Sequence, residues 1–129
     1  MVDYRKNDRY YGSDLNKFID ENCTHEMTSI NIDCIQYRRS KNKLRIIESK
    51  HTNERPMKKG QKELLQLLAR IFKYLNKIQN KLSFEICIVR GNDPYQNIEV
   101  INLINNKKFN IYGYEKIIKW LQFDYYLGE

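Results

Sequence analysis

The segment that most constrains the fold is a long stretch of helical periodicity set between two strand-like stretches. Leucine and isoleucine recur at intervals of three and four along residues 61–77, which predicts an amphipathic helix. Apolar, strand-like runs lie before it at residues 44–50 and after it at residues 82–89. Because strands and helices alternate, we expect an α/β fold with a mixed central sheet and helices packed on its faces.

The other elements follow from periodicity and turn residues, and together they fill one domain, residues 1–129. We expect a core at residues 13–89, preceded by an arm at 1–12 that has no clear period and followed by an extension at 90–129. A polar turn joins the first two strands and predicts an antiparallel hairpin. The expected elements are a helix at 14–23, strands at 30–37 and 44–50, the long helix at 61–77, strands at 82–89, 98–104 and 109–112, and a helix at 114–123.

The charge of the chain points to a class of partner. A net charge of +7 and a pI near 9.3 attract polyanions by steering and counterion release, which makes nucleic acid the first partner to test. No apolar run is long enough to span a bilayer and the first residues are polar, so we expect a cytoplasmic protein with no membrane partner. The three cysteines favour reduced thiols. Cys23 and His25 lack a second ligand pair for zinc.

The first hairpin brings three reactive side chains onto one face. If the turn is tight around residues 39–42, Asp33 faces Glu48, whereas a slip of two residues pairs Asp33 with Lys50 and keeps the same face. Two opposed carboxylates repel each other, and a bound divalent cation would remove that penalty. These carboxylates and the backbone carbonyl of Ser49 suit Mg²⁺ or Mn²⁺. Beside them, Lys50 would orient water or stabilise the transition state of phosphodiester hydrolysis.

The same residues carry a resemblance to a known family. The triplet Glu48-Ser49-Lys50 ends an apolar strand, an aspartate lies in the preceding strand, a helix comes before and a longer helix follows. This arrangement resembles the core of the PD-(D/E)xK nuclease superfamily, which would cover the core segment defined above. The resemblance implies a restriction-endonuclease-like fold, metal binding by Asp33 and Glu48, and a catalytic role for Lys50. Ile32 stands where the motif has proline.

Further site residues come partly from this resemblance. Several branches of the superfamily, the VRR-NUC group among them, carry a glutamine at the start of the helix after the lysine strand, which implies an active-site role for Gln61. That residue also shares the apolar stripe of the long helix, so it should face the sheet near Lys50. Many members add an acid from the first helix. Asp14 is the first candidate for this metal ligand and Glu21 the second, although Asp14 could instead be a helix cap.

Basic loop residues are candidates for contacts with nucleic-acid phosphates. One group lies at the hairpin tip and another in the loop after the catalytic strand: Arg38 and Arg39, and then Arg55, Lys58 and Lys59. The second group is the better candidate, because its loop starts at the expected site.

We therefore expect a nuclease that uses Mg²⁺ or Mn²⁺ to hydrolyse phosphodiester bonds, with DNA preferred over RNA. Small stand-alone members of the superfamily include Holliday junction resolvases and nucleases of phages and mobile elements, so branched DNA is a candidate substrate. Cutting two strands needs two sites, which favours a homodimer. Two alternatives stay open: a nucleic-acid-binding protein that keeps the fold without cleaving, and a basic protein-interaction module in which the triad is accidental.

Overall fold

The computed structural model describes residues 14–24, 26, 28, 32–52, 57–92 and 94–124. The expected arm, His25, residues 30–31 of the first expected strand and Arg55 lie outside the described residues. None of the described helices is both long enough and apolar enough to cross a membrane.

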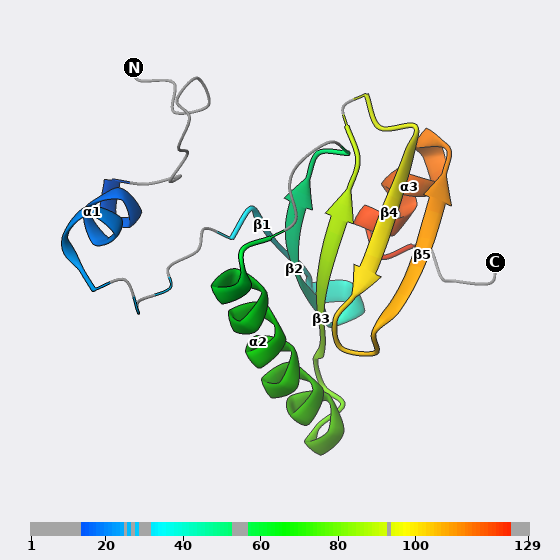
Figure 1. The fold of residues 1–129 in the computed structure, drawn as a ribbon. Helices are drawn as coiled ribbons and strands as arrows, with labels where there is room; N and C mark the ends of the chain where they lie inside the picture. The colour runs from blue at the N-terminus through cyan, green and yellow to red at the C-terminus, as the bar shows by residue number, and fades with distance from the viewer. Residues whose placement is uncertain are drawn as a thin grey trace.

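Within the described residues, five strands form one open mixed sheet in the order β1-β2-β3-β4-β5, accompanied by three α-helices (Figure 1). The parallel pair is β2 with β3, and the other neighbours are antiparallel. The α/β class and the expected hairpin of the first two strands are therefore confirmed. The elements are α1 (Asp14–Asn22), β1 (Cys34–Arg38), a 3-10 turn (Arg39–Lys41), β2 (Lys43–Lys50), α2 (Lys59–Ile78), β3 (Ser83–Arg90), β4 (Asn97–Asn102), β5 (Lys107–Tyr112) and α3 (Tyr114–Leu121).

The first hairpin has the tight register, one of the two that the sequence left open. The 3-10 turn ends at Asn42, whose left-handed backbone (φ 53°) reverses the chain. Asparagine tolerates this conformation better than most residues. β1 and β2 then pair Ile35 with Ile46 and Tyr37 with Leu44. This is the register in which Asp33, continued along the chain, comes opposite Glu48.

α2 covers one face of the sheet and runs back along it (Figure 1). Leu65, which is 1% exposed, packs with Ile46 and Ile86 in a buried cluster. At the other end of the helix, the Asn76 side chain makes two hydrogen bonds of 2.8 Å with the backbone C=O and N–H of Phe84. Because Phe84 lies at the start of β3, the N-terminal end of α2 lies near the carboxyl ends of β2 and β3.

α3 covers the opposite face of the sheet. Strand side chains alternate between faces, so Ile47 belongs to this face while its neighbour Ile46 belongs to the α2 face. The larger buried cluster on the α3 face consists of Ile47, Cys87, Val89, Ile98, Val100, Ile111, Ile117 and Trp120. Two cores on opposite faces thus hold the central strands in place.

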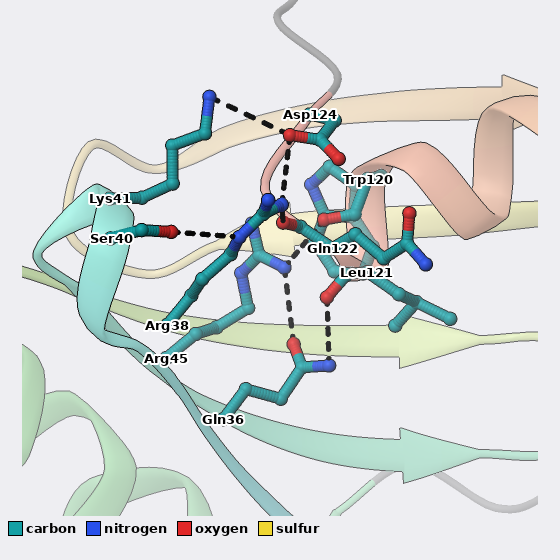
Figure 2. A network of polar contacts seen from close by, with 9 residues as sticks. All are labelled: Gln36, Arg38, Ser40, Lys41, Arg45, Trp120, Leu121, Gln122 and Asp124. Carbon is teal, nitrogen blue, oxygen red and sulfur yellow. Dashed lines mark hydrogen bonds and ion pairs between the residues drawn. The ribbon is translucent and has the colours of Figure 1, made fainter.

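Arg45 ties the end of α3 to the first hairpin (Figure 2). Its guanidinium lies 4.0 Å from the ring centroid of Trp120 and 4.2 Å from that of Phe123, and the residue is 3% exposed. Nη1 donates to the Trp120 carbonyl at 2.9 Å and to Gln36 Oε1 at 3.2 Å, while Nε lies 3.6 Å from Glu85 Oε2. Burial lowers the pKa of Arg45, and the Glu85 carboxylate opposes that shift. The Arg45 side chain therefore donates to a carbonyl in the last turn of α3, where the carbonyl groups lack intrahelical donors.

α1 does not cover the sheet, contrary to the expectation that the helices pack on its faces. Figure 1 shows α1 apart from the strands, and Leu15 and Phe18 are 66% and 61% exposed. The helix has nine residues and few apolar side chains. Burying them would release little hydrophobic free energy to offset the entropy lost on docking.

Candidate active site

The candidate site is built at the carboxyl end of β2. Glu48 and Lys50 are two residues apart on one strand, so both side chains point to the face that carries Ile46 and α2. Asp33 comes directly before β1, where the register of the hairpin places it opposite Glu48. The structure thus brings together the three residues that the sequence predicted to meet.

Two contacts fix the geometry of these side chains. The backbone N–H of Ser49 donates to Asp33 Oδ2 at 2.8 Å, which holds the carboxylate against the end of β2. Lys50 Nζ lies 3.5 Å from Glu48 Oε1, and both side chains are 14% exposed. In an antiparallel ladder the N–H and C=O of one residue point toward the same neighbour, so we expect the Ser49 carbonyl to point toward Asp33 as well.

The electrostatics of Asp33 and Glu48 favour one proton or one cation between the two carboxylates. Burial and the nearby Asp33 carboxylate raise the pKa of Glu48 to about 7, while Lys50 acts in the opposite direction. A carboxylate that is partly buried beside another acid is costly to ionise. A positive ligand at this place would remove that cost.

This raised pKa predicts how the stability of the metal-free protein depends on pH. Between the ordinary value of 4.5 and about 7, the folded state binds more protons at Glu48 than the unfolded state, so stability falls as pH rises through this window. Glu48→Gln removes the titration. In chelator at pH 8 we expect this variant to be more stable than the wild type by about 1–2 kcal/mol, a value discounted for solvent screening.

The measurement is urea unfolding of both proteins at several pH values in chelator. The difference should close as pH falls to about 4.5, where Glu48 is neutral in the folded wild type. Glu63→Gln, at an exposed position of α2, is the matched control and should show no such trend. A Glu48→Gln difference that does not change with pH would contradict the environment described for Glu48.

Gln61 lies in the first turn of α2. It is half-buried and lies one helical turn before Leu65, which packs on Ile46. Because α2 begins near the carboxyl end of β2, this places Gln61 at the Glu48 end of the helix. Its direct contact with substrate or metal remains a prediction.

Two residues that the sequence did not single out form hydrogen bonds with the segment that follows β2. Arg90 is the parallel partner of Lys50, and its Nη1 donates to the His51 carbonyl at 3.0 Å. Asn92 Oδ1 accepts from the Thr52 backbone N–H at 3.0 Å and lies 2.9 Å from His51 Nδ1. The register of a parallel pair would have identified them, but the sequence does not fix that register.

The basic candidates fall into two places. Lys58 and Lys59 lie at the start of α2, near the site, as expected. Arg38 and Arg39 lie at the hairpin tip, at the opposite end of β2, and so are not close to Glu48. Arg38 Nη1 donates to the Gln122 carbonyl at 2.5 Å and to Asp124 Oδ1 at 2.8 Å (Figure 2).

These contacts give Arg38 a role within the fold, while its contact with phosphate stays a prediction. Hydrogen bonding to Arg38 lowers the pKa of Asp124, so the two side chains form an ion pair on the α3 side of the sheet. Arg38 therefore anchors the end of α3, which competes with a phosphate contact. The Arg38 side chain points toward α3 because the even-numbered residues of β1 lie on the α3 face.

The acids of α1 are not brought to the site in this structure. Figure 1 shows α1 apart from the end of β2, which separates Asp14 and Glu21 from Glu48. Among the described residues, no group of three or more histidine, cysteine, aspartate and glutamate side chains is arranged to hold a metal ion. The carboxylates that this part of the chain brings together are the Asp33–Glu48 pair.

Comparison with known proteins gave no match: no family model matches the chain, and no curated protein and no solved structure is significantly similar to it. The function is therefore inferred from the geometry of the site.

Proposed function

We propose that the protein is a divalent-metal-dependent nuclease that hydrolyses phosphodiester bonds in DNA. The observation that carries this proposal is the meeting of Asp33, Glu48 and Lys50 on one face at the end of β2. A pair of acids next to an amine is costly as a structural device, since the acids repel each other. It is useful where a cation and a phosphate must be held together.

The donor set fits a hard cation. The Asp33 and Glu48 carboxylates and the Ser49 carbonyl are oxygen ligands of the kind that Mg²⁺ and Mn²⁺ prefer, with water and substrate oxygens for the remaining positions. Such a cation would supply Lewis-acid stabilisation of the charge that develops on the phosphate. Lys50, held beside Glu48, would orient the attacking water or donate to a phosphate oxygen. Gln61 would position the substrate from the start of α2.

The order of elements supports a restriction-endonuclease-like core. The chain runs α1–β1–β2–α2–β3, with an antiparallel hairpin followed by a helical crossover to a parallel strand. The common core of PD-(D/E)xK nucleases runs helix–three strands–helix–strand, so the described residues match this order except that two strands precede α2 instead of three. The second hairpin and α3 then extend the sheet and cover its other face.

A nucleic-acid-binding protein without cleavage activity is the second candidate. The observation that favours it is the 3.5 Å contact between Lys50 and Glu48, which partly neutralises the carboxylate without a metal. The two candidates differ in whether labelled DNA is cut.

The test is incubation of the protein with labelled single-stranded, duplex and branched DNA in Mg²⁺, Mn²⁺ or chelator. We expect cleavage of at least one substrate in metal and none in chelator. Glu48→Gln should be inactive on every substrate, with Glu115→Gln, at an exposed position of α3, as the active control. Equal cleavage by wild type and Glu48→Gln would indicate a contaminating nuclease and overturn the proposal.

A further inference from the structure

The outer surface of α2 carries a row of cations that the site itself does not use. Lys59, Lys62, Arg70, Lys73 and Lys77 are all exposed. With 3.6 residues per turn, their positions fall within a sector of about 80° on the helix, along one flank. The row begins next to the candidate site, because α2 starts near the end of β2.

Only one of these five cations has an ion pair with a carboxylate in the part of the chain that the structure describes. Lys59 has an ion pair with Glu63, at 4.0 Å and largely exposed to solvent. No described carboxylate forms an ion pair with the other four: Lys62, Arg70, Lys73 and Lys77. Like charges three and four residues apart on a helix repel each other, which destabilises the helix slightly. A polyanion along this flank would relieve that repulsion.

The length of the row matches a stretch of duplex. Lys59 and Lys77 are 18 residues apart, which at 1.5 Å per residue gives about 27 Å. One strand of a duplex rises 3.4 Å per phosphate, so this distance corresponds to about eight base pairs. Exposed lysines and arginines that contact phosphates position a duplex without reading its sequence.

We propose that double-stranded nucleic acid lies along this basic flank of α2, with α2 contacting the phosphate backbone over about eight base pairs. The inference rests on the proposed function and adds to it a substrate class and a binding surface. The duplex would lead from the flank of α2 to the end of β2, where cleavage occurs. Binding would be sequence-independent and strongly dependent on salt.

An anionic membrane is the competing partner for a basic helix. α2 also exposes Leu67, Ile71, Tyr74 and Ile78, at 51%, 47%, 62% and 58%. A helix that lies in a membrane interface has its polar face turned away from the apolar one and toward water. Here the exposed apolar residues lie between the basic flank and the face packed on the sheet, so the cations and the exposed apolar residues lie on different sides of α2. This arrangement favours a partner that takes the basic flank by itself.

The test compares two triple variants that lose the same charge. The first is Lys62→Gln, Lys73→Gln and Lys77→Gln, on the basic flank. The matched control is Lys81→Gln, Lys107→Gln and Lys116→Gln, which are exposed positions outside α2. Glutamine and lysine have similar helix propensities, so both variants should keep the circular dichroism spectrum and melting temperature of the wild type.

Binding to a labelled mixed-sequence duplex is measured by fluorescence anisotropy in chelator, where no cleavage occurs, between about 50 and 200 mM salt. The flank variant should bind at least tenfold more weakly, and its slope of log K against log salt should be smaller by about 2–3, or roughly 0.9 for each lost phosphate contact. The control variant should keep the wild-type slope.

Three results would overturn the inference: equal losses in both variants, an unchanged slope in the flank variant, or wild-type binding to phosphatidylserine vesicles with none to duplex. Failure of the nuclease proposal is distinguishable, because binding in chelator does not need the site. A protein that binds along α2 and never cleaves would refute the nuclease proposal while supporting this inference.

Discussion

Lys50→Ala is expected to lower the rate of DNA cleavage by about 10²–10⁴-fold, the range typical of a positioned acid–base or charge-stabilising group. Lys50 is 14% exposed and lies 3.5 Å from Glu48, so its amine is held where a phosphate bound near both acids would come. The carboxylates stay in place when the amine is removed. Cation binding should therefore persist and even strengthen, because a competing positive charge is lost.

The measurement is single-turnover cleavage at saturating protein, with the melting temperature in Mn²⁺ as the second readout. The control is Lys81→Ala, at an exposed position before β3, which should cleave like the wild type. Full activity in Lys50→Ala would remove this residue from the chemistry. A loss of activity together with a loss of Mn²⁺ stabilisation would mean that Lys50 holds the site's structure instead.

Arg45→Ala is expected to destabilise the fold by about 3–5 kcal/mol, the cost of breaking a buried charge pair by removing one partner. The variant leaves Glu85 without its ion-pair partner and removes one of the two hydrogen bonds to the Trp120 carbonyl, which keeps the bond from the Phe123 N–H. It also opens a cavity between the rings of Trp120 and Phe123, which the guanidinium now fills. Both effects act on the same end of α3.

Urea unfolding measures this loss, with Arg39→Ala at the exposed hairpin tip as the control. Arg45→Met should recover part of the stability, because a long apolar side chain fills the same space without leaving a charge. An Arg45→Ala variant as stable as the control would show that the stacked guanidinium contributes little. Cleavage activity at low temperature should survive in Arg45→Met, since Arg45 faces away from Glu48.

The site was predictable because it depends on local pairing. Alternation along two strands and a short turn fix the face on which each residue of a hairpin lies. The sequence left two registers open, and the structure has the one that pairs Ile35 with Ile46 and Tyr37 with Leu44. Asp33 and Glu48 come together through the same register. The start of β1 was predicted too early, because the Asp33 side chain takes the Ser49 N–H that a further strand residue would have bonded.

Contacts between distant segments were not predictable in the same way. The parallel register of β2 with β3 depends on how α2 packs, so the pairing of Lys50 with Arg90 could not be read from the chain. Strand alternation predicts the face on which Arg45 lies, but the sequence does not predict that the end of α3 packs against it. The exposed position of α1 also depends on a small difference between the hydrophobic free energy and the entropy lost on docking, which the periodicity of the sequence does not show.

The central claim is that Asp33 and Glu48 hold one divalent cation between them. Isothermal titration of Mn²⁺ into the metal-free protein tests it most directly, with Asp33→Asn, Glu48→Gln and the exposed control Glu115→Gln alongside. We expect one saturable site per chain in the wild type and the control, and its loss in both site variants. Equal Mn²⁺ binding by all four proteins, or binding by none, would contradict the account.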